Sequence, residues 1–382
     1  MQADAEKVLT IAEDEPAVTL KDAESAKAQA ERSSDRKGQA IATIQVAQAL
    51  SLTGKPQEAL AAVTEAMDLC EDTRFDVGRA AALALTARIV AAHGGGEDDA
   101  ELALESAEDA LRFFRRAGIR RGEAVALWSM ARVEAAFGGP QQVVRCARES
   151  IALLQELGES AAEAVVNHTL ADGLVAGGDV KRATLAMERA LAIYQTLADK
   201  KKQASCLHRI AQLEIQGSDP EKAVETMEKA RGAFNAVKDY KGEAEVMGTE
   251  RDMHLQEGRF AEAMRVAKET VTHYHKAGDT KLEGRSLLKV SELLLDNNDV
   301  DRAQKVAEVA MGVLSQASDP DGTKDAWEMM GAIKHARVKT EMQQVIELNS
   351  DFMHVPKTLV VDPGLNKRIQ AAYNESTKKK LF

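Results

Sequence analysis

Small and large apolar residues recur along the chain in a pattern that repeats every 40 residues. The one irregular step is 44 residues, between Gly78 and Gly122, and it places four extra residues in the turn around Gly94. A regular period of this length indicates a repeat architecture, in which each repeat packs only against its neighbours. The repeats begin at Gly38, Gly78, Gly122, Ala162, Lys202, Gly242, Leu282 and Gly322.

Each repeat contains a helix-ending residue sixteen positions after its start. Gly or Asn at this place can adopt the left-handed conformation that ends a helix. Pro56, Pro140 and Pro220 follow three of these residues, where proline suits the first turn of the next helix. Each repeat is therefore predicted to be helix, short turn, helix, short turn. The helix-ending residues are Gly54, Gly94, Gly138, Gly178, Ser218, Gly258 and Asn298.

Small residues form columns in both predicted helices. Since seven residues make two helical turns, the two columns of the second helix face the same side, where small side chains allow helices to approach closely. Arg251 interrupts the first-helix column. That column is Ala47, Ala87, Ala131, Ala171, Ala211 and Ser291. The second-helix columns are Ala59, Ala103, Val143, Ala183, Ala223, Ala263 and Ala303, and Ala66, Ala110, Ser150, Ala190, Ala230, Thr270 and Ala310. Large residues recur at Phe114, Leu154, Tyr194, Phe234, Tyr274 and Leu314.

The spacing of Ala47, Ala59 and Ala66 resembles the tetratricopeptide repeat. The last repeat also carries the family's opening pattern, Trp327-Glu328-Met329-Met330-Gly331, with Met for Leu. The longer period, and the stretch Gly122-Glu123-Ala124, are similar to the 40-residue subclass found in kinesin light chains and Partner-of-Inscuteable adaptors. The resemblance implies an all-α, right-handed superhelical solenoid of antiparallel helix pairs, with about eight repeats.

The two ends depart from the repeat. Residues 1–37 are predicted to form a shortened N-terminal repeat, whose second helix covers residues 17–33 and pairs with residues 1–13. Residues 38–350 form the repeat array, with an atypical closing helix after Val338, where the glycine of the loop is lost. Residues 351–382 contain two prolines and a β-branched run, which break the helical period. We expect an irregular tail there, with a short helix from about Leu365 to Tyr373.

Composition narrows the class of partner. The net charge is −11, and basic residues are mixed with acidic ones along the whole length, whereas a phosphate-binding surface needs clustered Lys and Arg. Nucleic acid and anionic membranes are therefore poor partners. No stretch approaches 18 apolar residues and the N-terminus lacks a signal-peptide core, so we expect a cytoplasmic protein without membrane insertion. Three lone cysteines, Cys70, Cys146 and Cys206, are expected to be small buried residues.

Residues with catalytic or metal-binding potential are few. His273 and His275 are two residues apart, so they point to different faces of a helix and do not share a metal. The Gly94-Gly95-Gly96 run is not followed by Lys-Ser or Lys-Thr, so it is a loop insertion rather than a phosphate-binding loop. We therefore predict no enzymatic activity, no metal and no cofactor.

The resemblance implies that the first helices line a concave groove and present two positions per repeat to a ligand. The predicted partner-binding residues are Arg88, Trp128, Arg132, His168, Asp172, His208, Gln212 and Asp252. Arg88 and Arg132 make one end basic, and Asp172, Asp252 and Glu292 make the other acidic. Two alternatives stay open: a chance assortment of surface residues, and a Trp128 that belongs to the core.

The predicted function is a protein-interaction scaffold or adaptor that holds a peptide or helical segment in this groove. The alternative is an architectural subunit of a larger assembly, which contacts its neighbours through the convex face and the C-terminal tail. The family's carboxylate clamp for chaperone tails is not reproduced, because its positions hold Ile44 with Gln48 and Ala84 with Arg88. The sequence itself does not name the partner.

Overall fold

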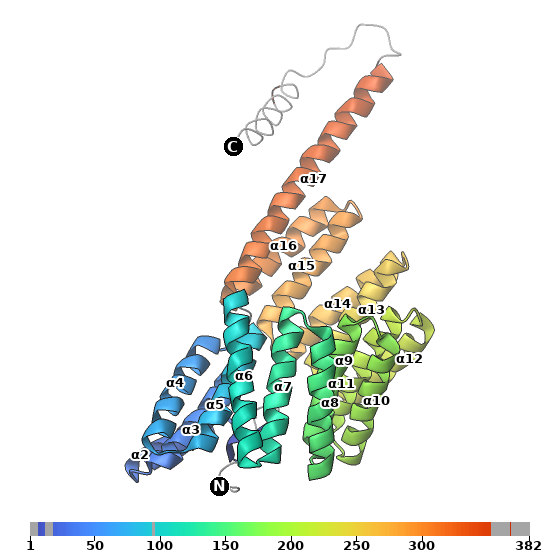
Figure 1. Ribbon diagram of the computed structural model, residues 1–382. Coiled ribbons are helices and arrows are strands. Elements are labelled where there is room, and N and C mark those ends of the chain that lie inside the picture. Colours follow the sequence, from blue (N-terminus) through green and yellow to red (C-terminus); the bar gives the residue numbers. More distant parts are fainter. Residues whose placement is uncertain (1–6, 12–17, 94–95, 353–366, 368–382) are drawn as a thin grey trace. The chain divides into compact units, whose positions relative to one another are not determined.

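The computed structural model describes residues 7–11, 18–93, 96–352 and 367, and every regular element among them is an α-helix (Figure 1). Successive helices are joined by short turns and pack against each other as pairs. The predicted all-helical fold of tetratricopeptide-like pairs is confirmed.

The first helices of the repeats are α3 (Arg36–Leu52), α5 (Asp76–His93), α7 (Arg120–Phe137), α9 (Ser160–Ala176), α11 (Lys200–Gln216), α13 (Tyr240–Gln256) and α15 (Thr280–Asp296). The second helices are α4 (Pro56–Asp72), α6 (Glu97–Ala117), α8 (Pro140–Leu157), α10 (Val180–Thr196), α12 (Pro220–Ala236), α14 (Phe260–Ala277) and α16 (Val300–Gln316). Two further helices flank them, α2 (Leu20–Arg32) and α17 (Pro320–Phe352).

The chain divides into two compact parts, Met1–Ala233 and Phe234–Phe382. In the first part each second helix packs against the next first helix, and consecutive first helices α3, α5, α7 and α9 also contact one another. In the second part α13 packs on α14, α15 on α16, and α17 contacts both α15 and α16. The first part therefore contains a continuous row of first helices, which forms the candidate site.

The turns within repeats depend on left-handed backbone at the predicted positions. Among the described ones, Gly54, Gly138, Gly178 and Gly258 have positive φ, and so do the non-glycine residues Ser218 and Asn298. The prediction for these helix ends is confirmed, while Gly94 lies outside the described residues. The turns between repeats also contain a residue with positive φ: Ser34, Arg74, Gly118, Gly158, Ala198, Lys238, Gly278 and Ser318.

The columns of small residues lie where helices touch. Ala59, Ala66 and Ala190 are fully buried. Where a serine replaces alanine in a column, its hydroxyl donates to a backbone carbonyl of the facing helix: Ser150 Oγ to Ala124 O and Ser291 Oγ to Ala303 O, both at 2.8 Å. Such direct bonds between side chain and facing backbone are possible only because the two helices approach closely.

At two repeat starts, Gly122 and Gly242, glycine is required by the phenylalanine of the preceding helix. A Cβ on Gly122 would lie 2.3 Å from the ring of Phe114, and one on Gly242 would lie 2.3 Å from Phe234. These distances are far inside van der Waals contact, so the aromatic ring occupies the space that any other side chain would need. The glycine and the large residue eight positions before it thus form one packing unit.

Both ends of the array differ from a regular repeat. The loop glycine is missing at Val338, so the predicted first helix of the last repeat and the closing helix join into the single helix α17. At the N-terminus, α2 agrees with the predicted second helix, but only Lys7 and Val8 of the described residues 7–11 are helical. The predicted C-terminal tail lies almost entirely outside the described residues, and the proposed domain limits stay a prediction.

The three cysteines are free and buried, as predicted. Burial raises the pKa of the Cys70 thiol to about 11 and also raises the pKa of the Cys146 thiol, so both stay protonated at neutral pH. The cysteines act as small packing residues.

Replacing Ala190 with Leu should destabilise the fold by about 1–3 kcal/mol, because the buried column has no room for the larger side chain. Ala192 on the same helix is exposed, so Ala192→Leu is the matched control and should have little effect. Urea unfolding of both variants measures the difference. Equal stability of the two variants would show that the column is not an interface.

Replacing Gly122 with Ala should destabilise the fold although alanine favours helix by about 1 kcal/mol, because the new methyl group meets the Phe114 ring. Gly232 lies within α12, is exposed and has no atom near its Cβ direction. Gly232→Ala should therefore stabilise the protein by about 0.5–1 kcal/mol. Thermal melting should show a lower melting temperature for Gly122→Ala and a higher one for Gly232→Ala. A higher melting temperature for both variants would contradict the contact between Gly122 and Phe114.

Candidate functional site

The candidate site is the inner face, which we define as the surface that α3, α5, α7, α9 and α11 present on the side away from their second helices. The repeat register assigns one predicted pair of residues to each of these five helices, and the two residues of a pair are four positions apart. In the first three helices the earlier residue is buried: Ile44, Ala84 and Trp128. The later residues Arg88, Arg132 and Gln212 are partly exposed, and Asp172 is exposed.

Trp128 does not lie open to a ligand. Its side chain is 2% exposed, and its indole Nε1 donates to Thr169 Oγ1 on α9 at 3.0 Å. The Arg88 guanidinium lies over the indole ring, 5.0 Å from its centroid. The prediction of an exposed aromatic anchor is therefore wrong, and the core alternative describes this residue. The physical reason is that Arg88 from α5 covers the face of the ring and Thr169 from α9 accepts its indole N–H.

The inner face holds residues from the N-terminus of the chain. We call Lys7–Ile11 the N-terminal segment. Gln45 Nε2 donates to Lys7 O at 3.2 Å and Gln48 Nε2 donates to Val8 O at 3.1 Å, both from α3. From α5, Arg88 Nη1 donates to Thr10 O at 3.4 Å.

Two apolar side chains anchor this segment. Val8 and Leu9 are 2% and 0% exposed and belong to the same core cluster as Ile44 and Ala84. Burying two such side chains contributes roughly 1.5–3 kcal/mol each before the entropy of ordering is subtracted. The segment is therefore docked by apolar burial, and the three side-chain donors fix its position.

Arg88 connects the segment to the core. Burial, and secondarily the nearby positive charge of Arg132, lower the pKa of Arg88 to about 10. At neutral pH Arg88 is still charged, so the guanidinium binds a carbonyl oxygen and the π face of Trp128 at the same time. These two partners replace part of the hydration that burial removes.

A polar network joins α9 and α11. Arg209 donates to Asp172 at 2.6 Å and to Gln212 Oε1 at 3.1 Å, and Gln212 Nε2 lies 3.2 Å from His208 Nε2. Burial, and secondarily Arg209, lower the pKa of His208 to about 4, so this imidazole is neutral at pH 7. His168 Nε2 lies 3.4 Å from Cys206 Sγ in the same region. The predicted residues on α9 and α11 are thus brought together.

The predicted acidic end of the groove is neutralised by ion pairs. Asp172 pairs with Arg209 at 2.6 Å. In the second part of the chain, Asp252 is exposed and pairs with Arg251 at 2.7 Å, and Glu292 pairs with Lys289 at 2.6 Å. Arg251, which interrupts the small-residue column, therefore has an electrostatic role. Each predicted acidic position has a basic neighbour, so the charge contrast along the array is weaker than the groove positions alone imply.

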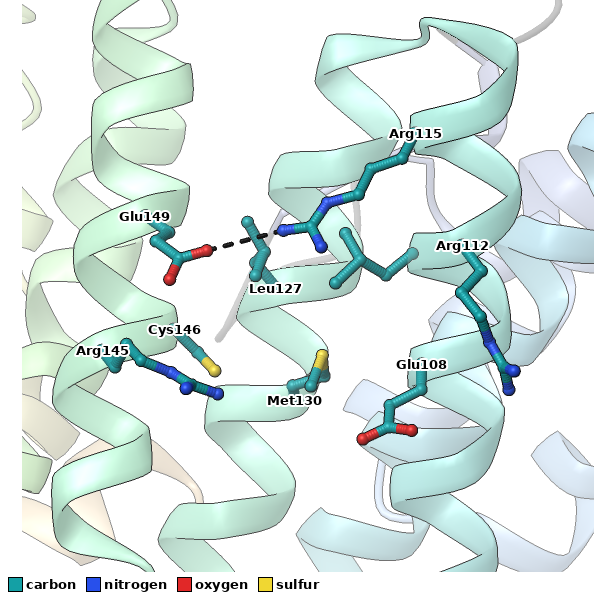
Figure 2. Close-up of a pocket in the computed structure, with 9 residues that line it drawn as sticks. Glu108, Arg112, Arg115, Leu127, Met130, Arg145, Cys146 and Glu149 are labelled. Atoms are coloured by element: carbon teal, nitrogen blue, oxygen red, sulfur yellow. Dashed lines mark ion pairs between the residues drawn. The ribbon is translucent and has the colours of Figure 1, made fainter.

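A pocket lies between α6, α7 and α8 (Figure 2). Its volume is about 390 Å³, and Leu127, Met130 and Cys146 form part of its apolar lining. Three arginines and two glutamates also line it, and Arg115 pairs with Glu149 at 3.6 Å. The edge of this pocket therefore carries charges of both signs.

No metal site or membrane span is seen among the residues that the structure describes. No group of three His, Cys, Asp or Glu side chains there could hold a metal ion. His273 contacts Glu243 while His275 contacts Glu283, so the two histidines do point to different partners. None of the helices in this described portion is both long and apolar enough to cross a bilayer.

Comparison with known proteins supports the architecture. No protein-family model and no curated protein sequence matches the chain. A signal transduction ATPase with a tetratricopeptide repeat sensor from Pyrococcus horikoshii is similar in structure, at 15% identity and TM-score 0.57, over 79% of this chain and 46% of that one. This chain thus spans less than half of that ATPase.

Two further solved structures align with the chain. A Rap protein complexed with competence and sporulation factor aligns at 11% identity and TM-score 0.50, over 83% of this chain and 93% of that one. A putative kinesin light chain with tetratricopeptide-like repeats from Podosopora anserina aligns at 19% identity and TM-score 0.42, over 50% and 93%. The chain is a tetratricopeptide-like helical repeat protein.

Sequence reasoning missed three features of this repeat protein's inner face. Gln45 lies one turn from Gln48 and outside the two expected ligand positions, and Arg209 follows His208 directly. The N-terminal segment carried one signal, the apolar pair Val8-Leu9 in an otherwise acidic terminus. Nothing in the pattern indicated that this pair docks on α3 and α5.

Replacing Trp128 with Ala should destabilise the protein by about 3–5 kcal/mol, because it leaves a cavity and an unpaired Thr169 hydroxyl. Trp327 is 64% exposed, so Trp327→Ala is the matched control and should change stability by less than about 0.5 kcal/mol. Urea unfolding measures both. Similar stability of the two variants would contradict the burial of Trp128.

Proposed function

We propose that this repeat protein is a protein-interaction scaffold that holds a segment of a partner protein on its inner face. The observation that carries the proposal is that α3 and α5 already hold a segment of polypeptide there. Gln48 and Arg88 occupy the same position in successive repeats and donate to carbonyls two residues apart, those of Val8 and Thr10. One repeat step on the inner face thus matches two residues of bound chain.

The same position continues along the row of first helices. Arg132, Asp172 and Gln212 follow at one residue per repeat on α7, α9 and α11. Arg132 and Gln212 carry donors and Asp172 carries an acceptor, the groups that a buried polypeptide backbone needs. A bound backbone would share or replace the contacts that Asp172 and Gln212 make with Arg209 and His208. The neutral His208 and the partly exposed His168 lie beside them. A partner segment that runs across α7, α9 and α11 would therefore meet polar groups at regular intervals.

The Rap protein complex offers a parallel at the level of the fold, since a repeat protein of similar architecture was solved together with a factor. The alternative role, an architectural subunit that uses the convex face, has weaker support. The exposed large apolar side chains Leu102 and Leu185 lie on different second helices, α6 and α10. Single exposed apolar residues are normal on a soluble surface and do not form a docking patch.

A photoreactive residue in place of Gln212 should crosslink the full-length protein to its partner in native extract, because this side chain lies on the inner face and is only half-buried. The matched control is the same residue in place of Arg189, which is exposed on α10 among the second helices. Mass spectrometry of the crosslinked peptides identifies the partner and the segment that is bound. Crosslinks to one protein from Arg189 alone would contradict inner-face binding and favour the architectural role.

A further inference from the structure

The N-terminal segment lies farther along the array than a first helix of a shortened repeat requires. A first helix at the N-terminus would contact α3, its next neighbour in the row. The segment contacts α3 through Gln45 and Gln48, and it also contacts α5 through Arg88. It therefore crosses the inner face, in the place where a ligand of this face would lie.

The contacts divide into two kinds. The three donors bind backbone carbonyls, which every residue possesses, so they hold a polypeptide without reading its sequence. Selectivity comes from the two buried side chains, Val8 and Leu9, which fill apolar space against the core. A ligand that replaced the segment would need two adjacent apolar residues and carbonyls free to accept hydrogen bonds, as at the end of a helix.

We propose that the surface of α3 and α5 that carries Gln45, Gln48 and Arg88 is a binding site for a partner segment with two adjacent apolar residues, and that the N-terminal segment fills this site until a partner displaces it. The proposal rests on the proposed function, because it places a partner on the same inner face. It adds the chemistry of the ligand and a competitor built into the chain.

The length of the connection makes such competition effective. Eight residues, 12–19, separate Ile11 from the first residue of α2. A short tether of this kind gives the segment an effective concentration of about millimolar at the site. If the segment is docked in about nine molecules of ten, an external ligand binds roughly tenfold more weakly than to the open site. Removing the competitor should therefore reveal a measurable gain in affinity.

The test uses the full-length protein and a fluorescent synthetic peptide with the sequence of residues 5–13. Leu9→Asp in the protein places a carboxylate at a position that is 0% exposed, so it should release the segment. Fluorescence anisotropy should show that this variant binds the peptide at least tenfold more tightly than the wild-type protein does. Adding Gln48→Glu to Leu9→Asp should weaken binding about tenfold, because it replaces a donor to the bound carbonyl with a carboxylate.

The controls separate docking from damage to the fold. The peptide that carries Asp in place of Leu should bind neither protein. Val8→Asp should reproduce the gain, and circular dichroism should show unchanged helix content in both variants. Folded variants that bind the peptide no better than the wild-type protein would overturn the proposal and make the segment a permanent part of the fold.

Two other outcomes are also informative. A wild-type dimer that Leu9→Asp converts to a monomer, measured by light scattering, would overturn the proposal by assigning the segment to a second copy of the chain. The Gln212 crosslink is independent of the segment, because Gln212 lies on α11 and the segment contacts α3 and α5. If the peptide experiment fails and the Gln212 crosslink succeeds, the proposed function stands and this proposal is overturned. If the peptide binds as expected but Gln212 gives no crosslink, the site on α3 and α5 stands and only binding at α11 is contradicted.

Discussion

The close approach of neighbouring helices is the constraint on which the rest of this structure depends. The small side chains of Ala59, Ala66 and Ala190 are fully buried and let helices pack closely. At Gly122 the ring of Phe114 occupies the space that a side chain would need. Once each pair is packed at this distance, the next pair can be added in only a narrow range of positions. In the part of the chain before Phe234, the first helices consequently stand in a row with a fixed step.

That row determines what the inner face can do. Because the helices are close, the earlier ligand position is buried at Ile44, Ala84 and Trp128, while Arg88 and Arg132, one turn after the last two, are partly exposed. The accessible residues are mostly polar and lie one repeat apart. Gln48 and Arg88 use this spacing to hold alternate carbonyls of the N-terminal segment. Packing of small residues and recognition of a backbone are thus two consequences of the same 40-residue period.

The fold could be predicted from the sequence because its determinants are local and periodic. Left-handed turn residues such as Gly138 and Asn298, and the columns of small residues, act within one repeat and its neighbours. Helix α17 continues through Val338 because no glycine or other left-handed turn residue ends the helix there. The predicted pairing of residues 1–13 with α2 stays a prediction. Leu9–Ile11 are not helical, and the contacts of the N-terminal segment with α3 and α5 are encoded by no local pattern.

The candidate site could be predicted only in part. The repeat register put Arg88, Asp172 and Gln212 on the first helices α5, α9 and α11, where they lie, and their role in binding a partner stays a prediction. Exposure was not predictable, because the burial of Trp128 depends on Arg88 and Thr169 from two other repeats. The negative charge at the predicted acidic end of the groove was overestimated for a similar reason, because Arg209 on α11 pairs with Asp172 on α9.

The central claim is that the inner face holds polypeptide, and the docking of Leu9 in solution tests it most directly. Solvent relaxation of methyl groups by a soluble gadolinium chelate, measured by NMR on the full-length protein, reports which leucines contact water. The account predicts that the Leu9 methyl groups are as protected as those of the buried Leu213, while those of Leu102 and Leu185, which are 62% and 54% exposed, relax strongly. Relaxation of Leu9 equal to that of Leu102 would show that the segment is undocked and would contradict the account.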